Sequence, residues 1–494
     1  EQDNRRYAKF ARVPCVEPSD SQEAKDMVAA AFQLGEQFDT PVFLRLTTRI
    51  CHSSTPVELG DRESRAPALE KFPRDPVKYV MIPGHARQRH PVIEERIARL
   101  AEFAETFPFN RVEWGDDDLG IVTCGVAYQY AREAFPRASI LRLGLTYPLP
   151  ARLLRDFASR VKRLVVVEEL DPFLEEEIKL LGIPCEGKSI FPVCGEFDAR
   201  VVRESAVAAG LLPASAGVPL PLDEVDGLEM PDIPPRPPVL CPGCPHRALF
   251  HVLSKRKVAV AGDIGCYTLA LLPPLSAIHT CGCMGAGIGV AHGAAQAGIG
   301  ERMVAVIGDS TFFHTGLPAL ANVAYNRSNV VTIILDNRIT GMTGHQQNPG
   351  TGRTLQMQEV PPLELEPLVR ALGIERVASV PAYDVETLDA TLKEFLQADG
   401  PSVLIAREEC ALLPDARRHW LPLEVIADKC NGCTMCFRIG CPAILKSDEL
   451  DEKTRRPKAL IDSLLCTGCE VCAQVCPRDA ILFREQVGAT LGDS

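Results

Sequence analysis

The sequence predicts a multidomain α/β protein, in which parallel sheets covered by helices precede a small cysteine-rich domain. Three observations predict this fold class. The chain has 494 residues, enough for three or four domains at roughly 100 to 200 residues each. Apolar strand-like and amphipathic helix-like segments alternate in two long stretches, which is typical of parallel sheets. Eight of the 19 cysteines lie between residues 430 and 476.

The first stretch of the chain contains one predicted helix and one predicted strand, within residues 18–48. Asp20 can cap the helix, and the apolar run PVFLRLTT forms the strand. One αβ unit cannot bury both faces of a strand, so we expect its sheet partners upstream of Glu1. Residues 1–60 are therefore interpreted as the end of a longer domain, and residues 61–115 as a connecting segment.

Two later stretches alternate strand and helix. Residues 116–210 contain the strands LGIVTCG, SILRLGL and RLVVVEE, and residues 241–420 contain VAVAGDIG, MVAVIGDS, VVTIILDN and SVLIARE. Each alternation predicts a parallel sheet in a domain of its own. Residues 211–240 end in PDIPPRPPVL and predict a proline-rich linker. Residues 421–494 form the cysteine-rich domain.

The composition excludes several classes of protein. The formal net charge of −12 disfavours nucleic acid and anionic membrane as main partners, because both attract basic surfaces. No apolar run approaches the ~18 residues that a membrane-spanning helix needs. Clustered cysteines and the lack of a signal peptide predict metal ligation in a reducing compartment, so a cytoplasmic location is expected.

The cysteine-rich domain carries two similar runs, each ending in a Cys-Pro pair. The second run has the CxxCxxCxxxCP spacing of bacterial ferredoxins, in which three thiolates of one run share a [4Fe-4S] cluster with the last cysteine of the other. The first run has one extra residue before its last cysteine, which lengthens a loop without removing a ligand. Zinc knuckles also use CxxC pairs, but the ferredoxin pattern fits better. The spacing assigns one cluster to Cys430, Cys433, Cys436 and Cys476, and the other to Cys466, Cys469, Cys472 and Cys441.

Two polar residues follow neighbouring predicted strands. Asp309 ends MVAVIGD and Asn337 ends VVTIILDN, 28 residues further on. This arrangement resembles the motif of thiamine-diphosphate enzymes, in which an acid and an amide at the carboxyl ends of adjacent parallel strands bind Mg²⁺. The resemblance implies that Asp309, Asn337 and the carbonyl of Ile339 ligate the metal. Gly308 and Ser310 belong to the same motif, although Ser310 stands where the motif usually has glycine.

A glycine-rich segment, HTCGCMGAGIGVAHGAA, opens a predicted helix. Backbone amides at Gly285 and Gly287 could approach the diphosphate of the cofactor, since helix N-termini bind anions. Close packing of the helix is the alternative explanation of these glycines.

A third set of cysteines falls inside or beside the same domain. A CxxC pair in CPGCPHR and two distant single cysteines are compatible with a third [4Fe-4S] site assembled by the fold, and buried structural cysteines are the alternative. This set consists of Cys241, Cys244, Cys266 and Cys410. His246, next to the pair, is a candidate contact of the cofactor, although a lone histidine is as often a packed or surface residue.

The order of these segments resembles the α subunits of indolepyruvate:ferredoxin oxidoreductases, within the 2-oxoacid:ferredoxin oxidoreductase family. The resemblance covers essentially the whole chain and is carried by YAKFA, EPSDSQEAKDM, GDSTFFHTG, LDNRITGMTGHQ and the long spacer of the first cysteine run. It implies a remnant of the pyrimidine-binding domain (1–60), a transketolase C-terminal-like domain (116–210), a diphosphate-binding domain (241–420) and a two-[4Fe-4S] ferredoxin domain (421–494). The third cysteine set would hold the family's proximal cluster.

The resemblance also implies an activity. The enzyme would oxidatively decarboxylate an arylpyruvate with coenzyme A to acyl-CoA and CO₂, and pass electrons through its clusters to ferredoxin. It would pair with a smaller β subunit, and αβ units would pair in turn. The family's catalytic glutamate matches a segment expected upstream of Glu1, so no catalytic residue is assigned.

Three alternatives remain open from the sequence. A related enzyme could act on another 2-oxoacid, such as phenylglyoxylate or a branched-chain oxoacid. A non-redox thiamine-dependent decarboxylase could have acquired a ferredoxin tail, and it would lack the proximal cluster. A non-catalytic electron-transfer or scaffold subunit would bind clusters without the cofactor, against which Asp309 and Asn337 argue.

Overall fold

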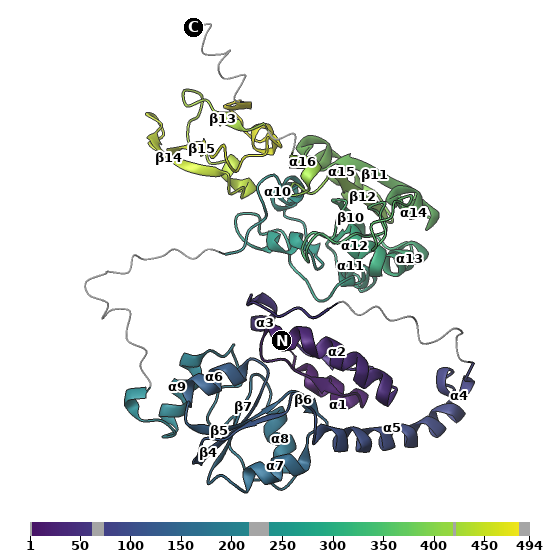
Figure 1. Ribbon diagram of the computed structural model, residues 1–494. Helices are drawn as coiled ribbons and strands as arrows, with labels where there is room; N and C mark the ends of the chain where they lie inside the picture. Colours follow the sequence, from purple (N-terminus) through teal and green to yellow (C-terminus); the bar gives the residue numbers. More distant parts are fainter. Residues whose placement is uncertain (1, 62–73, 217–236, 418–420, 484–494) are drawn as a thin grey trace. The chain divides into compact units, whose positions relative to one another are not determined.

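The computed structural model describes residues 2–61, 74–216, 237–417 and 421–483 (Figure 1). Parts of the expected connecting segment (62–73), of the proline-rich linker (217–236) and of the cysteine-rich domain (484–494) lie outside the described residues. The chain divides into two compact units, Glu1–Ile233 and Pro234–Ser494, here called unit 1 and unit 2. No helix in the described ranges is both long and apolar enough to cross a membrane.

The main sheet of unit 1 has four strands in the order β3-β5-β4-β7, and β4 pairs in parallel with both β5 and β7. Alternate residues along these strands enter two different apolar clusters, one on each face of the sheet. The predicted parallel sheet is thus confirmed for β4, β5 and β7, whereas the edge strand β3 pairs antiparallel with β5. Its strands are β3 (Arg111–Glu113), β4 (Asp116–Cys124), β5 (Ala138–Leu143) and β7 (Leu164–Val167). The helices of this part are α6 (Ala127–Ala134), α7 (Ala151–Ala158), α8 (Phe173–Leu180) and α9 (Ala199–Ala208), followed by the 3₁₀ turn η1 (Ala214–Ala216).

A second sheet of unit 1 corrects one expectation. The predicted strand after Pro41 is reduced to β2 (Phe43–Leu44), and it pairs in parallel with β1 (Cys15–Val16). β1 in turn pairs antiparallel with β6 (Leu145–Tyr147). Partners of this strand therefore lie within this chain. The reason is a long-range pairing between segments about 130 residues apart, which no local pattern reveals.

The first helices of the chain pack with these strands. Asp20 caps α2 (Ser21–Phe38) by accepting a hydrogen bond from the amide of Glu23, as predicted. The other helices before β3 are α1 (Asn4–Ala11), α3 (Thr48–His52), α4 (Pro76–Tyr79) and α5 (Pro83–Ala104). Ala8, Val13 and Cys15 share an apolar cluster with residues of β4, β5 and β7. The first segment thus belongs to the same compact unit as residues 116–210.

Unit 1 also contains a buried ion network formed by Asp3, Arg5, Glu17, Arg45 and Glu168. Arg5 donates to a carboxylate oxygen of Glu168 at 2.7 Å and to Asp3, and Arg45 donates to Glu17 at 2.6 Å. Glu168 also accepts from the amides of Leu174 and Glu175 at the start of α8. Each of these buried charges therefore has an opposite charge from the protein beside it.

The sheet of unit 2 has five parallel strands in the order β11-β12-β10-β9-β8. Alternate residues of β9, β10 and β12 enter two apolar clusters, so both faces are covered, as the continuous apolar strands predict. The strands are β8 (Val260–Ala261), β9 (Val304–Gly308), β10 (Val331–Asp336), β11 (Arg376–Pro381) and β12 (Ser402–Arg407). The helices are α10 (His246–Arg256), η3 (Cys266–Leu271), α11 (Ala286–Gln296), α12 (Asp309–Thr311), the π-helical turn η4 (Phe312–Gly316), α13 (Leu317–Tyr325), α14 (Leu365–Ala371), α15 (Val385–Gln397) and α16 (Pro414–Arg417).

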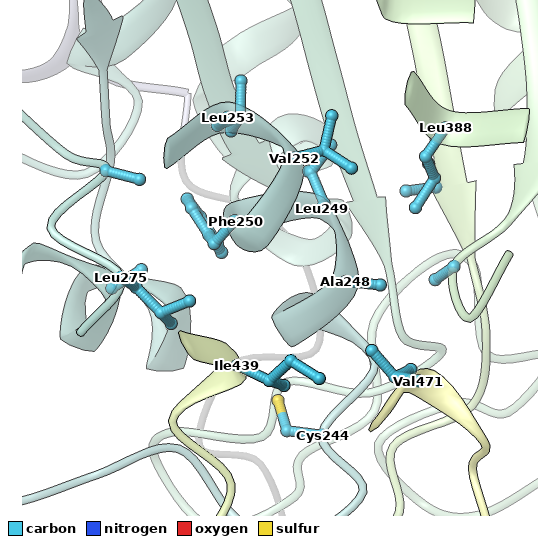
Figure 2. Packing of buried hydrophobic residues seen from close by; sticks show 14 of the residues in the cluster. Cys244, Ala248, Leu249, Phe250, Val252, Leu253, Leu275, Leu388, Ile439 and Val471 are labelled. Carbon is cyan, nitrogen blue, oxygen red and sulfur yellow. The ribbon is translucent and has the colours of Figure 1, made fainter. Parts of the chain in front are cut away.

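The cysteine-rich tail consists of two small antiparallel ribbons in the same unit. One pairs β13 (Leu423–Val425) with β16 (Ile481–Phe483), the other β14 (Ile444–Leu450) with β15 (Pro457–Ile461), and two short turns are η5 (Cys436–Ile439) and α17 (Val471–Gln474). Figure 2 shows Ile439 and Val471 of the tail beside Cys244 and Ala248 at the start of α10. The tail thus shares an apolar core with the parallel-sheet domain.

Candidate functional site

Asp309 and Asn337 come together at the carboxyl edge of the unit 2 sheet. β9 and β10 are adjacent and parallel, and Gly308 is paired in register with Leu335. The residues that follow these strands therefore meet at one edge. A single pocket is lined by both side chains and by other predicted cofactor or metal residues, namely Gly308, Ser310, Ile339, His246 and Cys266.

The carboxyl group of Asp309 is buried, with 2% of the residue exposed. Its oxygens accept hydrogen bonds from the amide of Ser310 at 2.7 Å and from Nδ2 of Asn348 at 3.3 Å. Burial, with a further contribution from Asp336, raises the pKa of Asp309 to about 7. Asp336 itself is paired with Arg407 at 2.7 Å. A buried acid with neutral hydrogen-bond donors suits a bound divalent cation, which supplies the missing positive charge.

The hydroxyl group of Ser310 accepts a hydrogen bond that glycine, the usual residue of the motif, could not accept. Thr340 donates to the hydroxyl of Ser310 at 2.9 Å, so the loop after β10 is joined to the loop after β9. Asn337 accepts the amide of Ile339 at its side-chain oxygen. These contacts hold the predicted metal-binding loops beside each other.

Asn348 and Tyr267 are two residues of this site that the sequence interpretation did not include. Asn348 donates to Asp309 and accepts the amide of Gly350 at 2.8 Å, so its side chain is held at both ends. The hydroxyl of Tyr267 accepts the amide of Gly308 at 3.0 Å. The Asn-Pro-Gly turn at 348–350 was the available signal, because such turns use the asparagine side chain to bind their own backbone.

The predicted role of Gly285 and Gly287 in binding the diphosphate stays a prediction. In the structure their amides donate to the two carboxylate oxygens of Asp263, at 2.7 and 2.9 Å. A Cβ atom at Gly287 would lie 2.7 Å from the carbonyl oxygen of Gly262. Close helix packing, the alternative explanation, therefore accounts for Gly287. Asp263 follows β8 and occupies the anion position at the start of α11.

His246 lies in the pocket at the start of α10 and is 4% exposed. Its ring meets that of Tyr267 edge to face, with centroids 6.0 Å apart. Burial lowers the pKa of His246 to about 4. The imidazole is therefore neutral at physiological pH, and it can donate or accept a hydrogen bond without adding charge to the pocket.

The eight cysteines of the tail gather around two pockets, in the two sets that the ferredoxin spacing predicts. In the described part of the chain, no three His, Cys, Asp or Glu side chains converge closely enough to hold a single ion. The sulfur atoms of each set stand instead around a pocket. One pocket is lined by Cys430, Cys433, Cys436 and Cys476, and the other by Cys441, Cys466, Cys469 and Cys472.

The surroundings of these sulfur atoms suit bound thiolates. Backbone amides of Leu423, Ala459 and Ala480 donate to the sulfur atoms of Cys466, Cys430 and Cys476 at 3.3 to 3.5 Å. Burial and the neighbouring sulfurs raise the pKa of Cys436 to about 11. Thiols so placed ionise when a metal compensates their charge, so the donor set fits an iron–sulfur cluster.

The third cysteine set is also brought together by the fold. Burial raises the pKa of Cys266, with further contributions from Cys241 and Cys410, and the pKa of Cys244 is raised by burial and by Cys241 and Cys266. The amide of Cys410 donates to the carbonyl of Asn337 at 3.1 Å. This set therefore lies directly beside the candidate metal site.

Two models of protein families match unit 2. "Thiamine pyrophosphate enzyme, C-terminal TPP binding domain" matches residues 263–406, and "4Fe-4S dicluster domain" matches residues 429–480. Thiamine diphosphate is another name for thiamine pyrophosphate. The fold and the matches together define the class, an α/β thiamine-dependent oxidoreductase with iron–sulfur clusters in its tail.

Comparison with curated relatives identifies one family within this class. "Indolepyruvate oxidoreductase subunit IorA" of Thermococcus kodakarensis is 41% identical over 97% of this chain and 79% of its own length. The subunit of the same name from Archaeoglobus fulgidus is 38% identical over 97% of this chain and 78% of its own. The chain belongs to the family of indolepyruvate oxidoreductase subunit IorA. Among solved structures, a 2-oxoglutarate:ferredoxin oxidoreductase from Magnetococcus marinus is 20% identical, with a TM-score of 0.33 over 37% of this chain and 69% of its own.

Proposed function

We propose that this subunit oxidatively decarboxylates an arylpyruvate of the indolepyruvate and phenylpyruvate class, with coenzyme A as acyl acceptor and ferredoxin as electron acceptor. The balanced reaction converts the 2-oxoacid anion and coenzyme A to acyl-CoA, CO₂, one proton and two electrons. One observation carries the proposal: a single pocket is lined by Asp309, Asn337 and Cys266, so the cofactor motif and a candidate cluster ligand meet at one place.

The residues present fit the cofactors that this reaction needs. Asp309, Asn337 and the carbonyl of Ile339 would hold Mg²⁺, which binds the diphosphate of the cofactor. When bound, thiamine diphosphate supplies the electron sink for decarboxylation, and iron–sulfur clusters accept the electrons singly. Asn348 orients the carboxylate of Asp309, and Ser310 fixes the neighbouring loop. The tail sets and the third cysteine set would each hold one [4Fe-4S] cluster.

The apolar part of the pocket supports an aromatic substrate. Ile264, Met284 and Met342 line the pocket and are 39, 42 and 53% exposed. Thioether side chains pack well against aromatic rings and adapt to their shape. Neutral His246 can orient the keto or carboxylate oxygen of a substrate by a hydrogen bond.

The relatives extend the proposal to partners and location. The relatives are named as a subunit of an oxidoreductase, so a second subunit is expected. We infer a smaller β subunit, αβ units that pair, ferredoxin as the electron acceptor and a cytoplasmic location.

The test uses anaerobically purified protein with its β partner, thiamine diphosphate, Mg²⁺, coenzyme A and indolepyruvate, and it follows the reduction of ferredoxin or a viologen dye. Reduction that depends on coenzyme A, faster with indolepyruvate or phenylpyruvate than with pyruvate or 2-oxoglutarate, is expected. CO₂ release without dye reduction would instead indicate a non-redox decarboxylase. Fast turnover of another 2-oxoacid, without turnover of the arylpyruvates, would contradict the proposed substrate class.

A matched pair of cysteine variants tests the link between the pocket and the electron path. Cys266→Ser should abolish dye reduction and remove one cluster from the iron count. Cys281→Ser changes an exposed cysteine of the same domain and should leave both unchanged. Equal behaviour of the two variants would contradict the assignment of Cys266.

A further inference from the structure

Arg247 places a buried guanidinium between two groups of cysteines. It is 3% exposed, and its Nε donates to the carbonyl of Cys241 at 3.0 Å. Its Nη2 donates to the carbonyl of Leu240, and its Nη1 donates to the carbonyls of Ile439 and Gly440 at 3.2 and 2.6 Å. One side chain therefore ties the loop of the CPGC pair to the turn that precedes Cys441.

The charge of Arg247 has no carboxylate beside it in the described ranges of the chain. All four hydrogen-bond acceptors are backbone carbonyls. Arginine stays protonated in proteins, and a buried charge normally requires an opposite one. The sulfurs of Cys441, Cys244, Cys241 and Cys469 are within electrostatic reach of the guanidinium and can carry negative charge. The guanidinium is thus placed to be balanced by thiolates of both cysteine groups.

A second, independent contact joins the loop of the CPGC pair to another segment of the same tail pocket. Gly243 has a φ of +65°, and a Cβ atom there would collide with the side chain of Thr467, which lies between Cys466 and Cys469. The carbonyl of Gly243 accepts from the hydroxyl of Tyr383 at 2.7 Å, and the carbonyl of Tyr383 accepts from Gln474 at 2.9 Å. The approach of the loops is therefore built into the backbone as well as into Arg247.

Each tail pocket is lined by one arginine, but only one of these two arginines is buried. Arg247 lines the pocket of Cys441, Cys466, Cys469 and Cys472. The other tail pocket is lined by Arg478, which is exposed, so water screens its charge. The buried cation acts at low dielectric, where a charge has a larger effect.

We propose that Arg247 positions these two cysteine groups for electron transfer and raises the reduction potential of the cluster at Cys441, Cys466, Cys469 and Cys472 above that of the other tail cluster. The inference rests on the cluster ligation proposed above. A cluster held by the third cysteine set would give up one electron, and a cluster held by Cys441 and its partners would take it up, with no proton transferred. Reduction adds one negative charge to that cluster, so a buried cation favours the reduced state.

The experiment is a redox titration of the holoenzyme with its β partner, followed by electron paramagnetic resonance. In Arg247→Gln, the ratio of reduced to oxidised cluster at a fixed potential should fall about tenfold for one tail cluster, which equals about 59 mV for one electron. The other tail cluster should keep its potential and serves as an internal reference. Lys255→Gln removes an exposed charge from the same helix, eight residues and about 12 Å along it, and should change neither potential.

Arg247→Lys separates charge from geometry, because lysine keeps the positive charge but lacks the planar fork. It should retain its iron and a potential close to that of the unchanged protein, even if Arg247→Gln loses a cluster. Unchanged potentials in a fully loaded Arg247→Gln protein would overturn the proposal, as would equal shifts or equal iron loss in both variants. Iron analysis and spin counts of the unchanged protein test the ligation separately: if they show fewer than three clusters, the ligation assignment fails before any variant is compared.

Discussion

Units 1 and 2 both bury charged side chains, but they differ in which of these charges the protein itself pairs. In unit 1, Arg5 and Arg45 are paired with Asp3, Glu17 and Glu168, all almost fully buried. In unit 2, the ion pairs of the described residues include none for buried Asp309 or buried Arg247. Buried charges that the protein itself compensates serve the fold, whereas uncompensated ones indicate where charged ligands belong. The comparison therefore separates structural from functional charges without reference to relatives.

The largest effect is expected from breaking the compensated network. Arg5→Met leaves Asp3 and Glu168 buried without their cation, which should lower the free energy of unfolding of unit 1 by about 3–5 kcal/mol. Urea denaturation in a Trp420→Phe background, which leaves Trp114 of unit 1 as the fluorescent reporter, measures this. The iron content of the tail should not change, and a loss below about 1 kcal/mol would show that the network is not structural.

The second largest effect is expected from removing Asp309, the buried acid without an ion pair. Asp309→Asn should weaken the Mg²⁺-dependent binding of thiamine diphosphate by about 100-fold or more, since second-shell partners alone contribute about 10- to 100-fold. The cofactor-free protein should become no less stable, because a desolvated charge is removed. Calorimetry of binding and thermal unfolding give both values. Glu375→Gln, an exposed acid of the same domain, is the control. If the cofactor-free variant were less stable than the unchanged protein, Asp309 would be a structural charge and the contrast between the two units would not hold.

A smaller effect is expected at the residue that orients this acid. Asn348→Ala removes the donor to Asp309 and should weaken cofactor binding about 10-fold. The control is Asn326→Ala at the C-cap of α13. Asn326 is exposed, so this change should not affect cofactor binding. Titration of both proteins with thiamine diphosphate at saturating Mg²⁺ distinguishes them, and equal affinities would remove Asn348 from the site.

The smallest effect is expected for an exposed arginine of unit 1, and it tests whether burial sets the size of the loss in stability. Arg6→Met removes an arginine that also pairs with two acids, Asp171 and Glu176, but its side chain is 43% exposed. Water already solvates these charges, so the free energy of unfolding should fall by about 1 kcal/mol at most. The urea experiment used for Arg5 measures it. Equal losses for Arg5 and Arg6 would mean that burial does not set the size of the effect.

The sequence predicted those parts of the fold and site that depend on local pattern. Apolar strands buried on both faces identified both parallel sheets, and the spacing of the tail cysteines predicted which of them gather around each pocket. The pairing of β1 with β6 was missed because its partners are far apart in sequence. The hydrogen bonds of Gly285 and Gly287 to Asp263 were not predicted, because the sequence of a helix start is the same whether a ligand or a carboxylate accepts from its amides.

Arg247 and Asn348 lay outside the prediction for a related reason. Each lies in a local motif, the CPGCPHR segment for Arg247 and the Asn-Pro-Gly turn for Asn348. The contact that gives each its role is made with a distant segment, residues 439–440 for Arg247 and Asp309 for Asn348. Residues that bind directly can be found by their chemistry and spacing. Residues that hold such groups in place are found by packing, which the sequence alone does not display.

The apolar core shared by the tail and the start of α10 has a consequence for how the protein is made (Figure 2). Ile439 and Val471 cover Cys244 and Ala248, so a tail that has not yet folded leaves an apolar surface of the preceding domain open to water. Because small cluster domains fold around their metal, iron delivery and burial of this surface are coupled. Cells short of iron would accumulate chains prone to aggregate, and assembly of the enzyme would follow the supply of clusters rather than the rate of translation.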